Sequence, residues 1–396
     1  MRWPIFSLYR QAYSGLPRRA WLLALVQFVN RSGSMVLFFL TLYLTSRLGF
    51  TLARAGQVVG AYGFGALLGA WLGGVLCDRL GATAVQKLSL TLGGLTLILL
   101  GYLRSFAPLA TAAFLLGIFA EALMPGNITA MARECPPAAR TRGFALNRLA
   151  ANLGVTIGPV VGGQLAMWDY HALFWADGLT SLAAAALLHA HFRGRPAPLP
   201  GGSATGGPGG VPQGTGRLPV LFALAFGIGL VFSQLFSTYP LYLHSAYGFA
   251  EGRIGQLLAV NTVLIVLFEM VLLHALRRVA GVRLIAGGAL LIGLGFALTP
   301  LGRGFAYGAA AVAVWTLGEM LCLPLLTTEI AARTHEGNRG RHMGWYGVSF
   351  SLAYMVGPVA GAEAYARFSP PALWLGCGVL GLLLALGFLR LGKDRE

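Results

Sequence analysis

Three glutamates stand inside long apolar stretches of this sequence, where a charge is costly to place. Glu121 follows AFLLGIFA, Glu269 follows VLIVLF and Glu319 follows VAVWTLG. A charge at the centre of a membrane-spanning helix costs about 2.5–3.5 kcal/mol on insertion scales, so such residues usually face a cavity and carry function. Burial favours the neutral form of a carboxyl group, so protonation near neutral pH is feasible. We expect a proton-coupling and substrate cavity with Glu319 as its main proton carrier; the alternative is that a glutamate only hydrogen-bonds a neighbouring helix.

A fourth ionisable residue, Arg31, follows Asn30 well inside the first apolar stretch. A lone arginine within a membrane requires a carboxylate partner or a wet cavity. One of the three glutamates is the natural partner, so we place Asn30 and Arg31 at the same site. The alternative is that the arginine side chain extends to the membrane interface, but its depth argues against this.

The remaining reactive residue types form no cluster. The seven histidines are dispersed, and the four cysteines stand singly without paired spacing. An acyltransferase would need histidine and acid residues close together, and a structural metal site or disulfide framework would need cysteine pairs. No nucleotide-binding G-x-x-x-x-G-K-[ST] loop is present. We therefore expect no enzyme, no metal and no cofactor, and a proton gradient as the energy source.

The elements that position these residues are membrane helices. Of the 396 residues, 56% are hydrophobic and 11% are charged, and the mean hydropathy is +0.70. A soluble domain carries about 25% charged residues. Because one span needs about 20 apolar residues, the chain accommodates about twelve. We predict spans at 20–45, 53–76, 84–103, 106–131, 143–167, 170–191, 218–244, 253–276, 281–301, 304–331, 342–366 and 371–391.

The net charge of +16 is distributed unevenly over the loops between these spans. Loops on one side carry 22 Lys and Arg residues, and loops on the other carry 6. Such asymmetry marks membrane topology rather than nucleic-acid binding, and the basic side faces the cytoplasm. We expect a multi-pass protein of the bacterial inner or plasma membrane with both termini cytoplasmic.

An internal repeat divides the chain into two halves. LYLTSRLGFTLARAGQ from Leu42 and LYLHSAYGFAEGRIGQ from Leu241 are identical at nine of sixteen positions. The stretch at 200–216 is rich in glycine and breaks the hydrophobic rhythm, as a linker would. We predict six-helix bundles at 1–192 and 217–396, joined by a cytoplasmic linker at 193–216. Parallel repeats of this kind place a substrate site between the halves, near the middle of the membrane.

The loop after the second span carries the motif G-x-x-x-D-R-x-G, with Gly74, Asp78, Arg79 and Gly81. It resembles the signature loop of the major facilitator superfamily. The resemblance implies the major facilitator fold, an all-α polytopic membrane protein of 12 transmembrane helices in two pseudo-symmetric six-helix bundles. It also implies a gating latch on the cytoplasmic side. Two basic residues usually follow the second glycine, but alanine and threonine stand here, so the latch is weaker.

The fifth predicted span contains GVTIGPVVGG, which fits G-x-x-x-G-P-x-x-G-G at Gly154, Gly158, Pro159, Gly162 and Gly163. This stretch resembles the antiporter motif of drug:proton antiporters. A helix with a bare glycine face and a proline can kink and pack closely on a neighbour. The same features serve packing in a transporter of either direction, so this alternative stays open.

The segment around Glu319 resembles the tenth helix of proton-coupled multidrug antiporters. The resemblance implies a secondary transporter, functioning as a monomer, that exchanges small lipophilic or cationic compounds for protons by alternating access. Proton-coupled transport of a nutrient, peptide, sugar or lipid is the alternative. Aromatic residues on the first, seventh, tenth and eleventh spans are candidates for the cavity wall, and we expect fewer than half to contact substrate: Phe28, Phe38, Phe39, Tyr43, Phe232, Phe236, Tyr239, Trp315, Trp345 and Tyr346.

Overall fold

The computed structural model describes residues 15–136, 139–192, 217–276, 278–334 and 339–393, and within these ranges it contains helices and no strands. The predicted linker at 193–216 lies outside them. The first half comprises α2 (Arg18–Ser32), α3 (Val36–Leu42), η1 (Tyr43–Arg47), α4 (Leu52–Leu80), α5 (Ala82–Leu100), α6 (Phe106–Glu134), α7 (Arg140–Trp168) and α8 (Tyr170–His191). The second half comprises α9 (Leu218–Ser233), η4 (Gln234–Phe236), α10 (Thr238–Tyr247), α11 (Glu251–Ala275), α12 (Gly281–Leu298), η5 (Thr299–Leu301), α13 (Phe305–Ala332), α14 (Arg339–Arg367) and α15 (Pro370–Lys393).

The described residues contain 11 helical stretches that are long and apolar enough to cross a membrane. The remaining long helix, α14, has 29 residues and begins with the polar stretch RGRHMGWYG, which lowers its hydropathy. It is still long enough to cross a hydrocarbon core about 30 Å thick. With α14 included, the predicted fold of twelve spanning helices is confirmed.

The first helix of each half is interrupted, which the predicted continuous spans at 20–45 and 218–244 missed. In the first half, the break between α2 and α3 begins at Gly33. A Cβ atom on Gly33 would overlap the Thr180 hydroxyl of α8, so only glycine permits this approach. In the second half, the short 3-10 segment η4 separates α9 from α10.

Two close helix contacts join the halves, α4 with α14 and α7 with α11. On α4, Gly56 and Gly60 lie against backbone oxygens of Pro358 and Met355 at distances that leave little space for a side chain. On α11, Gly255 lies against the backbone oxygen of Pro159. Small residues let membrane helices approach closely.

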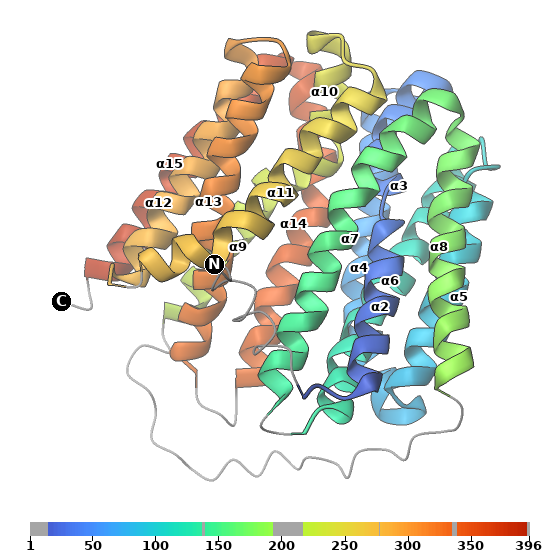
Figure 1. Ribbon diagram of the computed structural model, residues 1–396. Coiled ribbons are helices and arrows are strands. Elements are labelled where there is room, and N and C mark those ends of the chain that lie inside the picture. Colours follow the sequence, from blue (N-terminus) through green and yellow to red (C-terminus); the bar gives the residue numbers. More distant parts are fainter. Residues whose placement is uncertain (1–14, 137–138, 193–216, 277, 335–338, 394–396) are drawn as a thin grey trace, which may run out of the picture.

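These glycine contacts all lie toward one end of the molecule. We call the end at which α2 begins and α4 ends, near Arg18 and Arg79, the basic end. The glycine contacts between the halves lie toward the other end, which we call the opposite end. Figure 1 shows α7 and α11 side by side near the opposite end and diverging toward the basic end. The two halves are therefore packed together at the opposite end.

Candidate substrate and proton site

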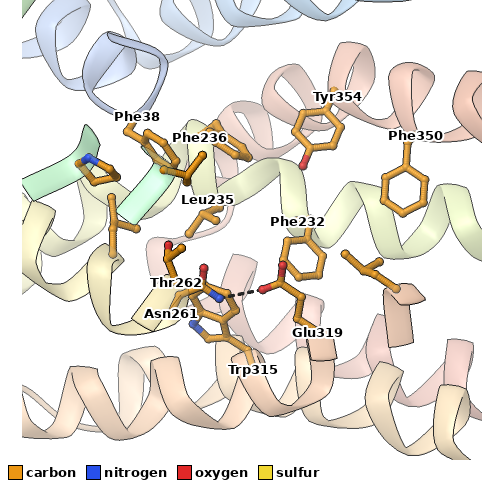
Figure 2. Close-up of a pocket in the computed structure, with 14 residues that line it drawn as sticks. Phe38, Phe232, Leu235, Phe236, Asn261, Thr262, Trp315, Glu319, Phe350 and Tyr354 are labelled. Carbon is orange, nitrogen blue, oxygen red and sulfur yellow. Dashed lines mark hydrogen bonds between the residues drawn. The ribbon is translucent and has the colours of Figure 1, made fainter. Parts of the chain in front are cut away.

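A cavity of about 170 Å³ lies between the two halves. Its wall draws on α3 and α7 of the first half and on α9, η4, α11, α13 and α14 of the second. Figure 2 shows its labelled residues, with the Tyr354 hydroxyl pointing inward. Glu319 stands near the middle of α13, so the cavity lies near the middle of the membrane. This is the location expected from the repeat.

The Glu319 carboxylate forms part of the cavity wall and is only half-buried. The Nδ2 group of Asn261 on α11 donates to Glu319 Oε2 at 2.7 Å and to Thr316 Oγ1 at 3.1 Å. A hydrogen bond to an ionised acceptor belongs to the stronger class. Asn261 therefore fixes the orientation of the carboxylate while leaving it accessible to a ligand. The predicted placement of Glu319 in a cavity agrees with this geometry.

Glu269 does not line this cavity. Its carboxylate is buried and forms an ion pair with Arg148 of α7, which joins the two halves. Both residues lie close enough to Glu319 to act on it electrostatically. The sequence did not predict this pairing, because Arg148 is one of the 22 basic residues counted with the loops, although it falls within the predicted span 143–167.

Glu121 and Arg31 form a separate polar group in the first half. Arg31 acts electrostatically on Glu121 and on Tyr62. Among the described residues, however, Arg31 has no carboxylate within the 4.0 Å of an ion pair, so the expected direct pair is not formed. Tyr354 lies within electrostatic reach of both Glu121 and Glu319.

Two further placements bear on this group. Asn30 is half-buried on α2 and does not line the cavity, so the geometry lends no support to its predicted role. A buried acid that the sequence analysis overlooked, Asp177 of α8, accepts hydrogen bonds from backbone N–H groups at the break of the first helix. Its position in the apolar run ALFWADGLTSLAA was the available signal.

Six of the fourteen residues that line the cavity are aromatic. Four of the ten predicted aromatics line the cavity: Phe38, Phe232, Phe236 and Trp315. The analysis missed Phe350 and Tyr354, which also line it. The Phe38 and Phe236 rings, one from each half, lie 4.7 Å apart between centroids. This pair joins the two halves in the cavity wall, where α3 meets η4.

The glycines of GVTIGPVVGG pack α7 against the broken first helix. A Cβ on Gly154 would lie 2.7 Å from Arg31 Cβ, and one on Gly158 would lie 3.0 Å from the Ser34 carbonyl oxygen. Gly162 similarly meets Met35, whereas Gly163 meets the Glu251 backbone of the other half. Pro159 itself lines the cavity. The motif thus links the break, the cavity and the contact between the halves.

The motif after α4 lies at the basic end. Gly81 has a φ of 88°, a left-handed conformation that allows the sharp turn between α4 and α5. The side chains of Asp78 and Arg79 are exposed, and neither forms an ion pair with another described residue. Gly74 has open space around it. The described residues thus contain no ion pair of this motif, and its gating role stays a prediction.

The described residues contain no cluster of side chains suited to holding a metal ion, and no disulfide. No group of three or more His, Cys, Asp or Glu side chains there is arranged to hold a metal ion. The cysteines at 77, 135, 322 and 377 are all free and buried. The cavity offers one carboxylate, one amide, the hydroxyl groups of Thr262 and Tyr354, and an aromatic surface, a set suited to binding and proton exchange.

The Major Facilitator Superfamily model matches residues 23–338. An uncharacterized MFS-type transporter, YttB of Bacillus subtilis, is 24% identical over 93% of this chain and 94% of its own length. A Na(+), Li(+), K(+)/H(+) antiporter of Planococcus maritimus is 24% identical over 92% of each chain. The multi-drug resistance efflux pump PmrA of Streptococcus pneumoniae is 29% identical over 32% of each chain.

Solved structures reproduce the fold over the full chain. A POT family transporter crystallised with a thioalcohol-conjugated peptide superposes with a TM-score of 0.83, covering 97% of this chain and 98% of that one. The sequence identity is 14%, so the similarity concerns the arrangement of the helices alone.

Proposed function

Because this chain belongs to the Major Facilitator Superfamily of membrane transporters, we propose that it exports small lipophilic cations in exchange for protons by alternating access. The observation that carries the proposal is the Glu319 carboxylate, set in the aromatic wall of a cavity between the two halves. A carboxylate attracts a cation, and the faces of Trp and Phe rings attract it further. The same carboxylate can instead take a proton.

The orientation follows from the basic residues, whose excess favours the cytoplasmic side. We place the basic end in the cytoplasm, so the packed opposite end faces outward. The contacts of the α4 and α11 glycines then close the outer side of the cavity. This arrangement is the cytoplasm-facing state of the transport cycle.

In the proposed cycle, ionised Glu319 takes up a cation from the cytoplasmic side. After the halves rock, a proton from outside neutralises the carboxylate and the cation leaves. The protonated carrier returns and releases its proton inward, where the Asn261 amide that donates to Glu319 Oε2 favours the ionised carboxylate. The proton brings about 1.4 kcal/mol for each unit of pH difference, whereas the membrane potential cancels because one monovalent cation leaves for each proton that enters.

The names of two relatives support this direction of transport. One is a multi-drug resistance efflux pump and another exchanges alkali cations for protons. The resemblance of the glycine-proline stretch of α7 to the antiporter motif of drug:proton antiporters supports it as well. Monomeric function belongs to the same proposal.

The test compares cargo classes in proteoliposomes with an imposed pH gradient. We expect flux of a lipophilic cation such as ethidium to exceed that of alkali cations, dipeptides and sugars. The Glu319→Gln variant should lose at least about tenfold of this flux, because unit charges 4 Å apart attract by about 4 kcal/mol at an effective dielectric constant near 20. Glu363→Gln is the matched control, since Glu363 pairs with Arg367 at the exposed end of α14.

A higher flux of dipeptides or sugars than of ethidium would contradict the proposed cargo and identify a nutrient transporter. Equal ethidium flux in the wild type and in Glu319→Gln would remove Glu319 from the mechanism.

A further inference from the structure

We propose that Asp177 is a positioning residue that holds the break of the first helix and thereby sets the outer closure of the cavity. Its carboxylate is buried, with 6% of the residue exposed. Oδ2 accepts hydrogen bonds from the backbone N–H groups of Met35 and Val36, at 3.1 and 3.0 Å. Where a helix is interrupted, the N–H groups that open the next segment need an acceptor from elsewhere.

Two neighbouring helices hold the break on separate sides. On the α8 side, a Cβ atom on Gly33 would overlap the Thr180 hydroxyl and lie 3.2 Å from Asp177 Oδ1. On the α7 side, Gly158 meets the Ser34 carbonyl oxygen, at 3.0 Å from an added Cβ. Asp177 thus acts where the glycine-proline stretch of α7 also packs.

The held segment leads directly to the closure between the halves. Phe38 lies within one turn of the two N–H groups that Asp177 binds, and its ring contacts Phe236 of η4. The helix that carries it, α3, also contacts α10 of the second half. A shift at the break therefore moves the aromatic contact that closes the outer side of the cavity.

Among the described residues of the second half, the corresponding positions do not repeat this hydrogen-bonding arrangement. The repeat offset of 199 that pairs Leu42 with Leu241 places Gly376 at the position of Asp177 and Gln234 at that of Met35. There the Gln234 amide donates to the Gly357 carbonyl oxygen at 2.9 Å, and its oxygen accepts from Thr238 at 2.8 Å. Beside Gly376 a cavity of about 380 Å³ opens instead of a carboxylate. The hydrogen bonds from a carboxylate of α8 to the break of the first helix are therefore specific to the first half.

In the proposed role Asp177 is ionised, because two backbone N–H donors on one carboxylate oxygen favour the charged form. Arg31, at the end of α2, also acts electrostatically on Asp177. Hydrogen bonds to an ionised acceptor are roughly twice as strong as neutral ones. Asparagine at this position would keep an acceptor oxygen without the charge, whereas alanine would remove both.

The experiment measures access to the cavity from outside. A reporter cysteine is introduced at Thr262, which lines the cavity and is buried, in a background with the four native cysteines replaced by alanine. Intact cells are treated with a membrane-impermeant maleimide. We expect Asp177→Ala to raise the labelling rate about tenfold and Asp177→Asn to give a smaller increase. Asp169→Asn, which alters a carboxylate at the exposed start of α8, should leave the rate unchanged.

Equal labelling of Thr262→Cys in wild type and Asp177→Ala would overturn the inference. If Asp177→Ala does not reach the membrane, Asp177→Asn decides: a rate equal to wild type contradicts the role of the charge. Ser46→Cys serves as a separate control, because Ser46 is exposed at the opposite end. It must be labelled in every variant, which shows that the opposite end faces the outside of the cell. The inference rests on the proposed alternating access, but labelling needs neither cargo nor a proton gradient. Loss of ethidium specificity would therefore leave it standing.

Discussion

At the scale of single residues, the cavity combines one accessible carboxylate with one amide that orients it. Glu319 and Asn261 come from different helices, α13 and α11, and meet at 2.7 Å. Because Asn261 also donates to Thr316, its side chain is held before any ligand binds. A carboxylate in a fixed orientation loses less conformational freedom when it binds a cation.

Removing this amide tests its contribution to cargo binding. We expect Asn261→Ala to raise the KM for an exported cation about tenfold with a smaller change in the maximal rate, because the carboxylate loses its orienting donor. Asn261→Ser keeps a hydroxyl donor on a shorter side chain, so its KM should lie between those of the wild type and Asn261→Ala. Transport kinetics in proteoliposomes provide the measurement, and an unchanged KM in Asn261→Ala would exclude an orienting role.

Residue types alone predicted Glu319 but not its surroundings. An acid in an apolar run is visible in the sequence, because its insertion is costly wherever it points. The partners of Asp177 and Arg148 depend on packing: one binds backbone N–H groups 142 and 141 positions away in the chain, and the other pairs across the two halves. No local pattern records such contacts.

At the scale of helices, glycine determines how closely the two halves can approach. An added Cβ on Gly63 of α4 would lie 2.6 Å from the Met355 backbone of α14, closer than real side chains allow. The apolar runs and the internal repeat were enough to predict the twelve spans. They did not predict the break at Gly33, although the polar stretch NRSGS around this glycine was an available signal for one.

Filling the contact between α4 and α14 should hinder the packed state. Overpacking typically costs about 1–3 kcal/mol, so we expect Gly63→Val to lower ethidium export by about fivefold or more. Gly287→Val on α12 is the matched control, because no atom lies within 4 Å of an added Cβ there. Equal export by both variants would show that this contact does not limit the cycle.

At the scale of the whole molecule, the two halves are alike in fold and unlike in charge. The first half carries Arg31, Glu121 and Asp177, and the second carries Glu269 and Glu319. A single ion pair between described residues, Arg148 with Glu269, connects them. A tether of this kind can couple the charge state near Glu319 to the relative position of the halves.

Reversing this pair tests whether the tether matters for the cycle. Removing Arg148 leaves the buried charge of Glu269 without its partner. Because the Arg148 side chain is 57% exposed, solvent already screens this ion pair, and the loss of transport rate is moderate. We expect Arg148→Gln to slow ethidium export about three- to tenfold. The double exchange of Arg148→Glu with Glu269→Arg should restore part of the rate, measured as a double-mutant cycle. A double variant no faster than the slower single one would argue against a direct coupling.

The central claim is that one carboxylate exchanges cargo for protons, and a trapped pH dye tests it most directly. Proteoliposomes loaded with ethidium at equal internal and external pH are diluted into ethidium-free buffer, with protein-free liposomes as the leak control. The account predicts that the interior acidifies as ethidium leaves through the wild type and that Glu319→Gln abolishes this acidification. Protein-dependent ethidium efflux without a pH change, or acidification at the wild-type rate in Glu319→Gln, would contradict it.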